Sequence, residues 1–270
     1  MMGPFRLFAL ALKRARTLLA ATGLLLGAFQ VLMVFIASSI KPEAMGQIAD
    51  LLPPLVQKIL GPSVASVMSF SGIACIGYFD LVIVIALLAL AIALATLPAS
   101  EIETGVADLL LARPLPRHWI ITRTIALVVF AITLMLMLMM VGTWIGLVMF
   151  ASEIDMWPSA TTVASLALNL GLLTFCWGGI ATAFGAVCRR SVAGAATGLL
   201  ALFMLLLDLV RSIWSPAESV AWLSPFHYFI PFDIVMGRPL PAENLIVLWA
   251  IAMTGFTVAY FLFSQRDISR

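Results

Sequence analysis

Six long apolar runs constrain this chain more than any other feature of its sequence. They cover residues 18–37, 72–97, 119–150, 161–187, 192–213 and 244–263. A helix needs roughly 20 apolar residues to cross the hydrocarbon layer of a membrane, and each run supplies about that number or more. The chain is 63% hydrophobic and 10% charged, against roughly 25% charged residues in a soluble domain. We therefore predict an all-α integral membrane protein, one domain over residues 1–270 with six transmembrane helices.

The segment before the first run is amphipathic. Phe5, Phe8 and Leu12 share one helical stripe, and Arg6, Lys13 and Arg16 share another. This pattern is typical of a helix that lies in the membrane interface, so we predict an N-terminal interfacial helix over 4–17. The alternative, a signal peptide, fits less well because its apolar core is roughly 7–15 residues long and the run 18–37 is longer.

The basic residues are unevenly distributed between the two sides that six spans define. One side would hold eleven of them and the other four: Arg6, Lys13, Arg14, Arg16, Arg113, Arg117, Arg123, Arg189, Arg190, Arg266 and Arg270 against Lys41, Lys58, Arg211 and Arg238. Cytoplasmic loops carry the excess of Lys and Arg. The distribution therefore predicts that both termini and the stretch 98–118 are cytoplasmic.

The stretch 98–118 is a polar interruption with clear helix punctuation. Ser100 and Glu103 have the spacing of a capping box, and Pro114 with Pro116 would end a helix. Between them the residues separate into an apolar face of Ile102, Val106, Leu109 and Leu110 and a polar face of Glu101, Thr104 and Asp108. We predict a short cytoplasmic helix over about 100–112.

Motifs of catalysis and of nucleotide binding are absent from the sequence. It contains no G-x-x-x-x-G-K-[ST], no H-E-x-x-H and no G-x-S-x-G. Its three cysteines lack the spacing of a metal site, and a net charge of +2 gives no argument for nucleic acid. We expect no catalytic residue, no metal and no cofactor bound by this chain, and we do not expect an enzyme.

Two carboxylates lie inside apolar runs, and two interpretations of them stay open. A charged side chain in a span faces protein or water, because its exposure to lipid costs roughly 2.5–3.5 kcal/mol at the centre. Asp80 and Asp208 could pair structurally near helix ends, Asp208 with Arg211 three residues on. Alternatively, Asp80, Asp208 and Arg211 could line an outward-facing cavity.

Pairs of glycines four residues apart favour close helix packing. They are Gly23/Gly27, Gly142/Gly146 and Gly194/Gly198. Packing within one chain and a seam between two copies both fit this pattern.

The stretch 98–118 resembles the cytoplasmic loop of ABC-type export permeases that work with a separately encoded ATPase. Glu101, Glu103, Gly105, Leu109 to Leu111, Pro114 and Arg117 follow the order of the family pattern, and Ser224 to Phe226 and Arg266-Asp267 extend the likeness. Over most of the chain it looks closest to the permeases of nitrous-oxide-reductase maturation. Arg123 and Thr124 stand where the family often has a lysine.

The resemblance implies a permease that forms a dimer in a bacterial inner (plasma) membrane and exports a substrate. A partner ATPase would hold ATP and Mg²⁺ and dock on the helix over 100–112, the coupling helix. The residues implied in coupling are Glu101, Glu103, Gly105, Asp108, Leu110, Leu111, Pro114 and Arg117, and those implied in the dimer seam are Gly23, Gly27, Gly194 and Gly198.

Further alternatives stay open at this point. One is a secondary transporter or channel that needs no ATPase. Another is an ABC-type membrane subunit that acts in the maturation of another protein, with a periplasmic or other extracytoplasmic protein as a further partner.

Overall fold

The computed structural model describes residues 4–40, 64–104, 118–151, 157–211 and 219–265, and within these ranges every regular element is helical. The long helices are α1 (Pro4–Ser39), α6 (Leu81–Ala95), α9 (His118–Phe150), α10 (Ala160–Val187), α11 (Arg190–Arg211) and α14 (Ala242–Gln265). Six helical segments of the described residues are long and apolar enough to cross a membrane, α6 being counted from Ile76. The predicted all-α fold with six spans is therefore confirmed.

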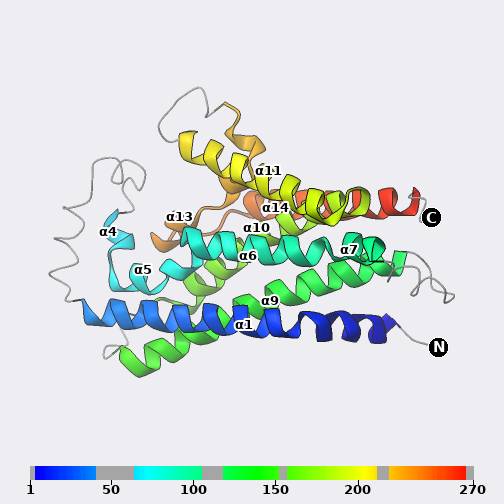
Figure 1. Cartoon of the computed structure of the whole chain (residues 1–270). Helices are drawn as coiled ribbons and strands as arrows, with labels where there is room; N and C mark the ends of the chain where they lie inside the picture. The colour runs from blue at the N-terminus through cyan, green and yellow to red at the C-terminus, as the bar shows by residue number, and fades with distance from the viewer. Residues whose placement is uncertain (1–3, 41–63, 105–117, 152–156, 212–218, 266–270) are drawn as a thin grey trace.

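The bundle has two distinct ends, as Figure 1 shows. The start of α1, the end of α14 and the short helix α7 (Leu97–Glu103) lie together at one of them, here called the α7 end. The opposite end, here called the α5 end, carries the short elements α4 (Val64–Val67), α5 (Phe70–Ala74), η2 (Ile76–Tyr78) and α13 (Pro231–Val235). Two further short elements, η4 (Ala221–Leu223) and η5 (Pro225–Tyr228), lie between α11 and α13 in the chain. The beginning of the first span and the end of the last span thus lie on the same side as α7, as expected for a chain that crosses the membrane six times.

The first helix differs from its prediction. Instead of an interfacial helix over 4–17 followed by a separate span, α1 runs without a break for 36 residues, which at 1.5 Å per residue is about 54 Å. Its small side chains Ala11 and Ala15 are buried, in line with Leu19 and Leu26 further along. Because one face of α1 packs against the bundle both in its first turns and further along, α1 continues straight and does not bend into the membrane plane.

The second span is also not the single helix predicted over 72–97. Asp80 separates η2 from α6, and α6 has 15 residues. At the other end α6 stops at Thr96, because Pro98 lacks the N–H that would bond to the carbonyl of Leu94. The predicted run therefore contains parts of several helices.

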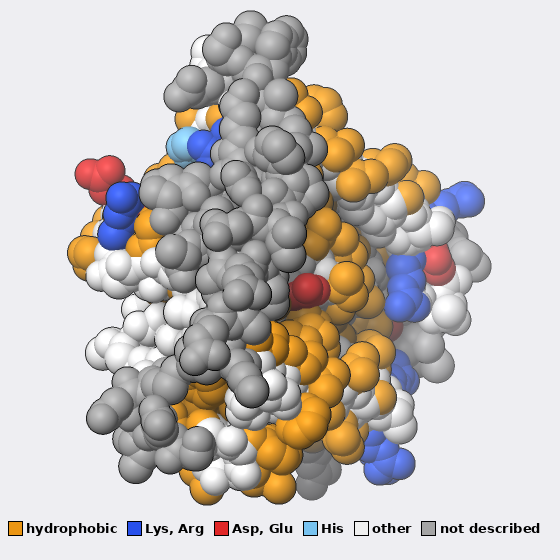
Figure 2. Space-filling model, turned by 90° about the vertical axis from the view of Figure 1, so that its left-hand side faces the viewer, with side chains coloured by type: hydrophobic (Ala, Val, Ile, Leu, Met, Phe, Trp, Pro, Cys, Tyr) orange, Lys and Arg blue, Asp and Glu red, His pale blue; other side chains and the backbone are white. Residues whose placement is uncertain are grey.

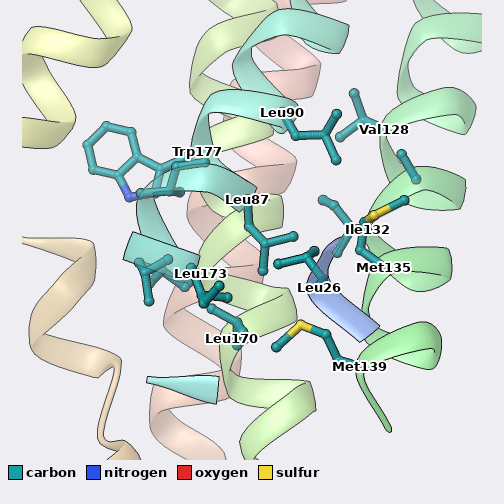
Figure 3. Close-up of a cluster of buried hydrophobic side chains, with 14 of the residues drawn as sticks. Leu26, Leu87, Leu90, Val128, Ile132, Met135, Met139, Leu170, Leu173 and Trp177 are labelled. Carbon is teal, nitrogen blue, oxygen red and sulfur yellow. The ribbon is translucent and has the colours of Figure 1, made fainter. Parts of the chain in front are cut away.

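The core lies between α1, α6, α9 and α10 (Figure 3). Leu87 of α6, Met135 and Met139 of α9 and Leu170 of α10 are fully buried there. α10 is the most buried of the six spans, and it packs against α6, α9, α11 and α14. Large apolar side chains remain exposed around the bundle, and many of them are visible beside the undescribed grey residues in Figure 2. Such a surface suits lipid rather than water.

Glycines allow two pairs of helices to approach closely. On α9, a Cβ added to Gly142 would overlap the backbone carbonyl of Gly27 on α1. On α10, a Cβ added to Gly179 would overlap the backbone of Ala252 on α14, next to Gly255. Small residues let helix backbones come together where apolar burial does not drive association. Glycines therefore bring the backbone of α1 close to α9 and the backbone of α10 close to α14.

The same contacts correct one expectation about the dimer seam. Gly23 faces the side chains of Leu138 and Met135, and Gly27 lies against α9. These two glycines are used within the chain, so they are not available to a second copy. For Gly194 and Gly198 on α11, an added Cβ would meet no described atom within 4 Å, and this pair stays a prediction for the seam.

We expect Gly142→Ala to destabilise the purified protein, because the new methyl group must displace the α1 backbone. Overpacking of this kind costs about 1–3 kcal/mol. Gly194→Ala is the matched control, measured on the monomer: it makes the same change at a position where no described atom of the chain lies within 4 Å, so the midpoint of thermal unfolding should stay the same or rise slightly. Equal midpoints for the two variants would contradict the tight α1/α9 contact.

Candidate functional site

The candidate site is the first turn and a half of the predicted coupling helix, at α7. This helix begins at Leu97, with Thr96 as its N-cap and no side-chain capping bond. The predicted capping box is therefore wrong. Ser100 lies inside the helix, where its carbonyl accepts hydrogen bonds from the Thr104 N–H at 3.0 Å and from the Thr104 hydroxyl at 2.8 Å.

A buried ion pair holds α7 to α9. The Glu101 carboxylate accepts a hydrogen bond from Nη2 of Arg123, and their side chains are 10% and 7% exposed. Nη1 of Arg14 on α1 lies 3.5 Å from the other carboxylate oxygen, with 65% of the Arg14 side chain exposed. Two arginines from two spans thus share one carboxylate. Breaking such a buried pair by removing one partner is strongly destabilising.

A second set of contacts joins α7 to the start of α11. The Glu103 carboxylate accepts a hydrogen bond of 2.6 Å from the backbone N–H of Arg190. Nη1 of Arg190 donates to the Ser100 hydroxyl at 3.2 Å. A carboxylate at the first N–H groups of a helix satisfies a free donor and opposes the positive end of the helix dipole. Glu103 is therefore used within the chain.

The apolar side of α7 is also in contact with the bundle. Ile102 packs against the cluster of Ile120, Ile121 and Phe263, from α9 and α14. Just before α7, a Cβ added to Gly185 of α10 would lie 3.3 Å from the Ala95 carbonyl oxygen. Residues of α7 and its N-cap region therefore contact α1, α9, α10, α11 and α14. A displacement of α7 would act on several spans at once.

Several predicted coupling residues lie outside the described residues. These are Gly105, Asp108, Leu110, Leu111, Pro114 and Arg117. The described part brings Glu101 and Glu103 together with Ser100, Arg14, Arg123 and Arg190. The sequence pattern paired Ser100 with Glu103 as a capping box and did not predict the three arginine partners. A signal was present for Arg123, because it is a charged residue inside the first turns of an apolar run.

The three candidate cavity residues have structural contacts. Asp80 is the N-cap of α6, and its Oδ1 accepts hydrogen bonds from the N–H groups of Val82 at 2.9 Å and Ile83 at 3.3 Å. Asp208 pairs with Arg211 on the same helix, at 2.7 Å. The observed contacts are structural ones near helix ends: Asp80 caps α6, and Asp208 pairs with Arg211. They agree with the first of the two interpretations left open.

His227 lies near the Asp208 and Arg211 pair, in η5. Burial lowers the pKa of His227 and the Arg211 guanidinium lowers it further, while the Asp208 carboxylate opposes both. The imidazole is therefore held toward its neutral form. Its Nδ1 is buried and has no hydrogen-bond partner among the described residues.

Residues 219–241, before α14, fold back onto the bundle through contacts that the sequence analysis did not predict. Asn169 of α10 donates to the Tyr228 carbonyl at 3.2 Å and accepts from the Ile230 N–H at 3.1 Å. Ser224 is fully buried, caps η5 and donates to the Met204 carbonyl at 3.0 Å. These bonds join residues 224–230 to α10 and α11. Ser224, the first residue of the Ser224 to Phe226 motif, therefore has a structural role.

Comparison with known proteins gives no family to set beside this geometry. No family model matches the chain, and no curated protein matches it.

The Glu101–Arg123 pair can be tested with a double-mutant cycle. We expect Glu101→Gln and Arg123→Gln each to lower the free energy of unfolding by about 3–5 kcal/mol, because each leaves a buried charge unpaired. The double variant should be less destabilised than the sum of the two. Arg14→Gln removes the exposed partner and should cost about 1 kcal/mol or less. Additive effects of the two buried substitutions, measured by denaturation in detergent, would argue against the pair.

Asp80 offers a test that separates capping from charge. Asn caps a helix about as well as Asp, whereas Ala loses about 0.5–2 kcal/mol. We expect Asp80→Asn to keep the unfolding midpoint of the parent protein and Asp80→Ala to lower it. An Asp80→Asn protein that folds normally but loses its cellular function would instead indicate a role for the negative charge.

Proposed function

We propose that this chain is the membrane subunit of an ATP-driven exporter that works as a dimer and takes its energy from a separate cytoplasmic ATPase. The observation that carries the proposal is the attachment of α7 to the spans, through Glu101 to Arg123 and Arg14 and through Glu103 to Arg190. A helix that receives force from a partner needs such a connection, since a loosely tethered helix would move alone.

The chain's own chemistry supports a division of labour. Its sequence has no phosphate-binding loop, so hydrolysis would take place on the partner with ATP and Mg²⁺. In this proposal the ATPase binds the segment after Thr104, and closure of two ATPase subunits displaces α7. The spans then change between inward and outward access, by as much as the ATPase favours one state over the other.

The proposal divides the predicted coupling residues into two groups. Glu101 is buried and Glu103 bonds to Arg190, so both act as positioning residues that hold α7 in place. Direct contact with the ATPase is then expected from Leu110 and Leu111, which follow the described part of the helix.

Two features are compatible with dimerisation through α11. It is the least buried of the six spans, and its exposed side chains include Leu199, Leu202 and Phe203. Gly194 and Gly198 have open space beside them, as a close approach of two helices requires. The α7 end would face the cytoplasm of a bacterial-type inner membrane, because the basic residues of the sequence gather on that side.

A secondary transporter is the second candidate, and one observation favours it. The second span is interrupted between α5, η2 and α6, and transporters often bind substrates where spans are broken. Near this break the Tyr78 hydroxyl lies 3.0 Å from the Thr143 hydroxyl, and the buried amide of Gln30 has no hydrogen-bond partner among the described residues. The break lies at the α5 end, away from the mid-membrane position that such sites usually occupy.

The partner can be tested directly. Purification of the tagged full chain from its native cell in a mild detergent should recover a nucleotide-binding protein in roughly equal amount. Leu110→Asp should weaken this association by roughly 30-fold or more, as loss of a central apolar contact does, and should abolish stimulation of ATP hydrolysis by the membrane subunit. Arg238→Gln, at the α5 end, is the control. Normal stimulation by Leu110→Asp would reject the coupling role of this helix, and absence of any nucleotide-binding protein would favour the secondary transporter.

A further inference from the structure

A cavity beside α7 is the strongest unassigned feature of the molecule. It has a volume of about 310 Å³ and lies between α1, the end of α6, α7 and the start of α11. Its lining changes from polar to apolar along the length of the bundle. Arg14, Ser100, Glu101, Thr104 and Arg190 form the polar part, and Ala15, Leu18, Ala93 and Leu94 contribute to the apolar part.

The position of this change matches the edge of the membrane. Arg190 is the first residue of a candidate span, and Ala93 lies two residues before the end of another. In a membrane crossed by these spans, the polar part of the cavity would lie at the depth of lipid headgroups, and the apolar part would extend toward the acyl chains. A free solute would meet apolar walls over most of this space, whereas a phospholipid matches both the polar part and the apolar part.

The charges around the cavity leave an excess of positive charge. Arg14, Arg123 and Arg190 face two carboxylates, those of Glu101 and Glu103. Arg123 neutralises Glu101, and Glu103 bonds to the backbone N–H of Arg190 rather than to its guanidinium.

The two arginines that line the cavity keep donors available. The Arg14 side chain is 65% exposed and lies 3.5 Å from a carboxylate that already has a closer partner. The described bond of the Arg190 guanidinium is to a neutral hydroxyl, that of Ser100. A guanidinium with free donors binds phosphate oxygens well.

From these observations we propose that the cavity is a binding site for an anionic phospholipid. The headgroup phosphate binds Arg14 and Arg190, and an acyl chain lies along Ala15, Leu18 and Ala93. Basic pockets between spans are known to select anionic lipids in this way. A bound lipid would connect α1 to α11 next to α7. The proposal requires a membrane protein but does not depend on an ATPase partner or on export.

The test uses the full chain, stripped of lipid in a neutral detergent and titrated with phosphatidylglycerol or with phosphatidylcholine of the same acyl chains. Native mass spectrometry gives the bound lipid, and the unfolding midpoint gives an independent readout. We expect a preference for phosphatidylglycerol. Arg14→Gln and Arg190→Gln should each weaken its binding about fivefold, and the double variant about 25-fold.

The chain provides a matched control for the charge. Arg238 has a 64% exposed side chain and an ion pair of 2.9 Å with Asp233 of α13, which lies at the α5 end. Arg238→Gln should leave the lipid preference unchanged. Ala93→Phe fills the apolar part and leaves the arginines in place, and it should weaken the binding of phosphatidylglycerol as well.

Several outcomes would overturn the proposal. Equal binding of the two lipids by the parent protein would do so, as would arginine variants that behave like Arg238→Gln. Inorganic phosphate that stabilises the protein as much as the lipid would indicate a phosphate site instead. If the arginine variants keep their lipid preference but lose a bound protein, the arginines dock that protein.

Discussion

The position of α7 depends on one buried carboxylate. The Glu101 side chain is buried. A buried carboxylate needs a counter-charge, because removal of an unpaired ion from water costs several kcal/mol. Arg123 supplies this charge from inside the bundle, and Arg14 adds a second from the surface of α1. An arrangement that brings Glu101 to Arg123 avoids this cost. The same arrangement places Ser100 and Glu103 against Arg190, so α7 and the start of α11 are held together.

The spans of the bundle differ in how closely they pack against one another. At Gly142 the backbone of α9 is in direct contact with the backbone of α1, and at Gly179 the backbone of α10 is in direct contact with that of α14. By contrast, α11 buries little of its surface, and glycines on it face open space. Arg190 nevertheless ties this helix to α7. A force on α7 would therefore act on a loosely packed span and on a rigid pair of spans at the same time, and the loosely packed span offers the lower resistance.

Local patterns predicted much of the fold and less of the site. The six spans followed from apolar runs, because a membrane requires long apolar helices whatever their packing. The break at Asp80 and the continuity of α1 depend on capping and on tertiary burial, which apolar runs do not reveal. Ser100 and Glu103 formed a valid local capping signature, but Pro98 lies inside the observed helix and Arg190 binds both side chains. Pairing of Glu101 with Arg123 required knowledge of which span ends lie together.

The use of the acidic residues within the chain bears on how a partner would bind. A carboxylate that already satisfies a buried arginine or a helix N-terminus has little left to offer another protein, and drawing it away would expose the unpaired group it leaves. Glu101 and Glu103 are both committed in this way. Recognition by a cytoplasmic partner should then depend on shape and apolar contact beyond Thr104 rather than on the acidic pair. In the proposed function, the acidic residues would contribute stiffness, so that movement imposed on α7 reaches α1, α9 and α11.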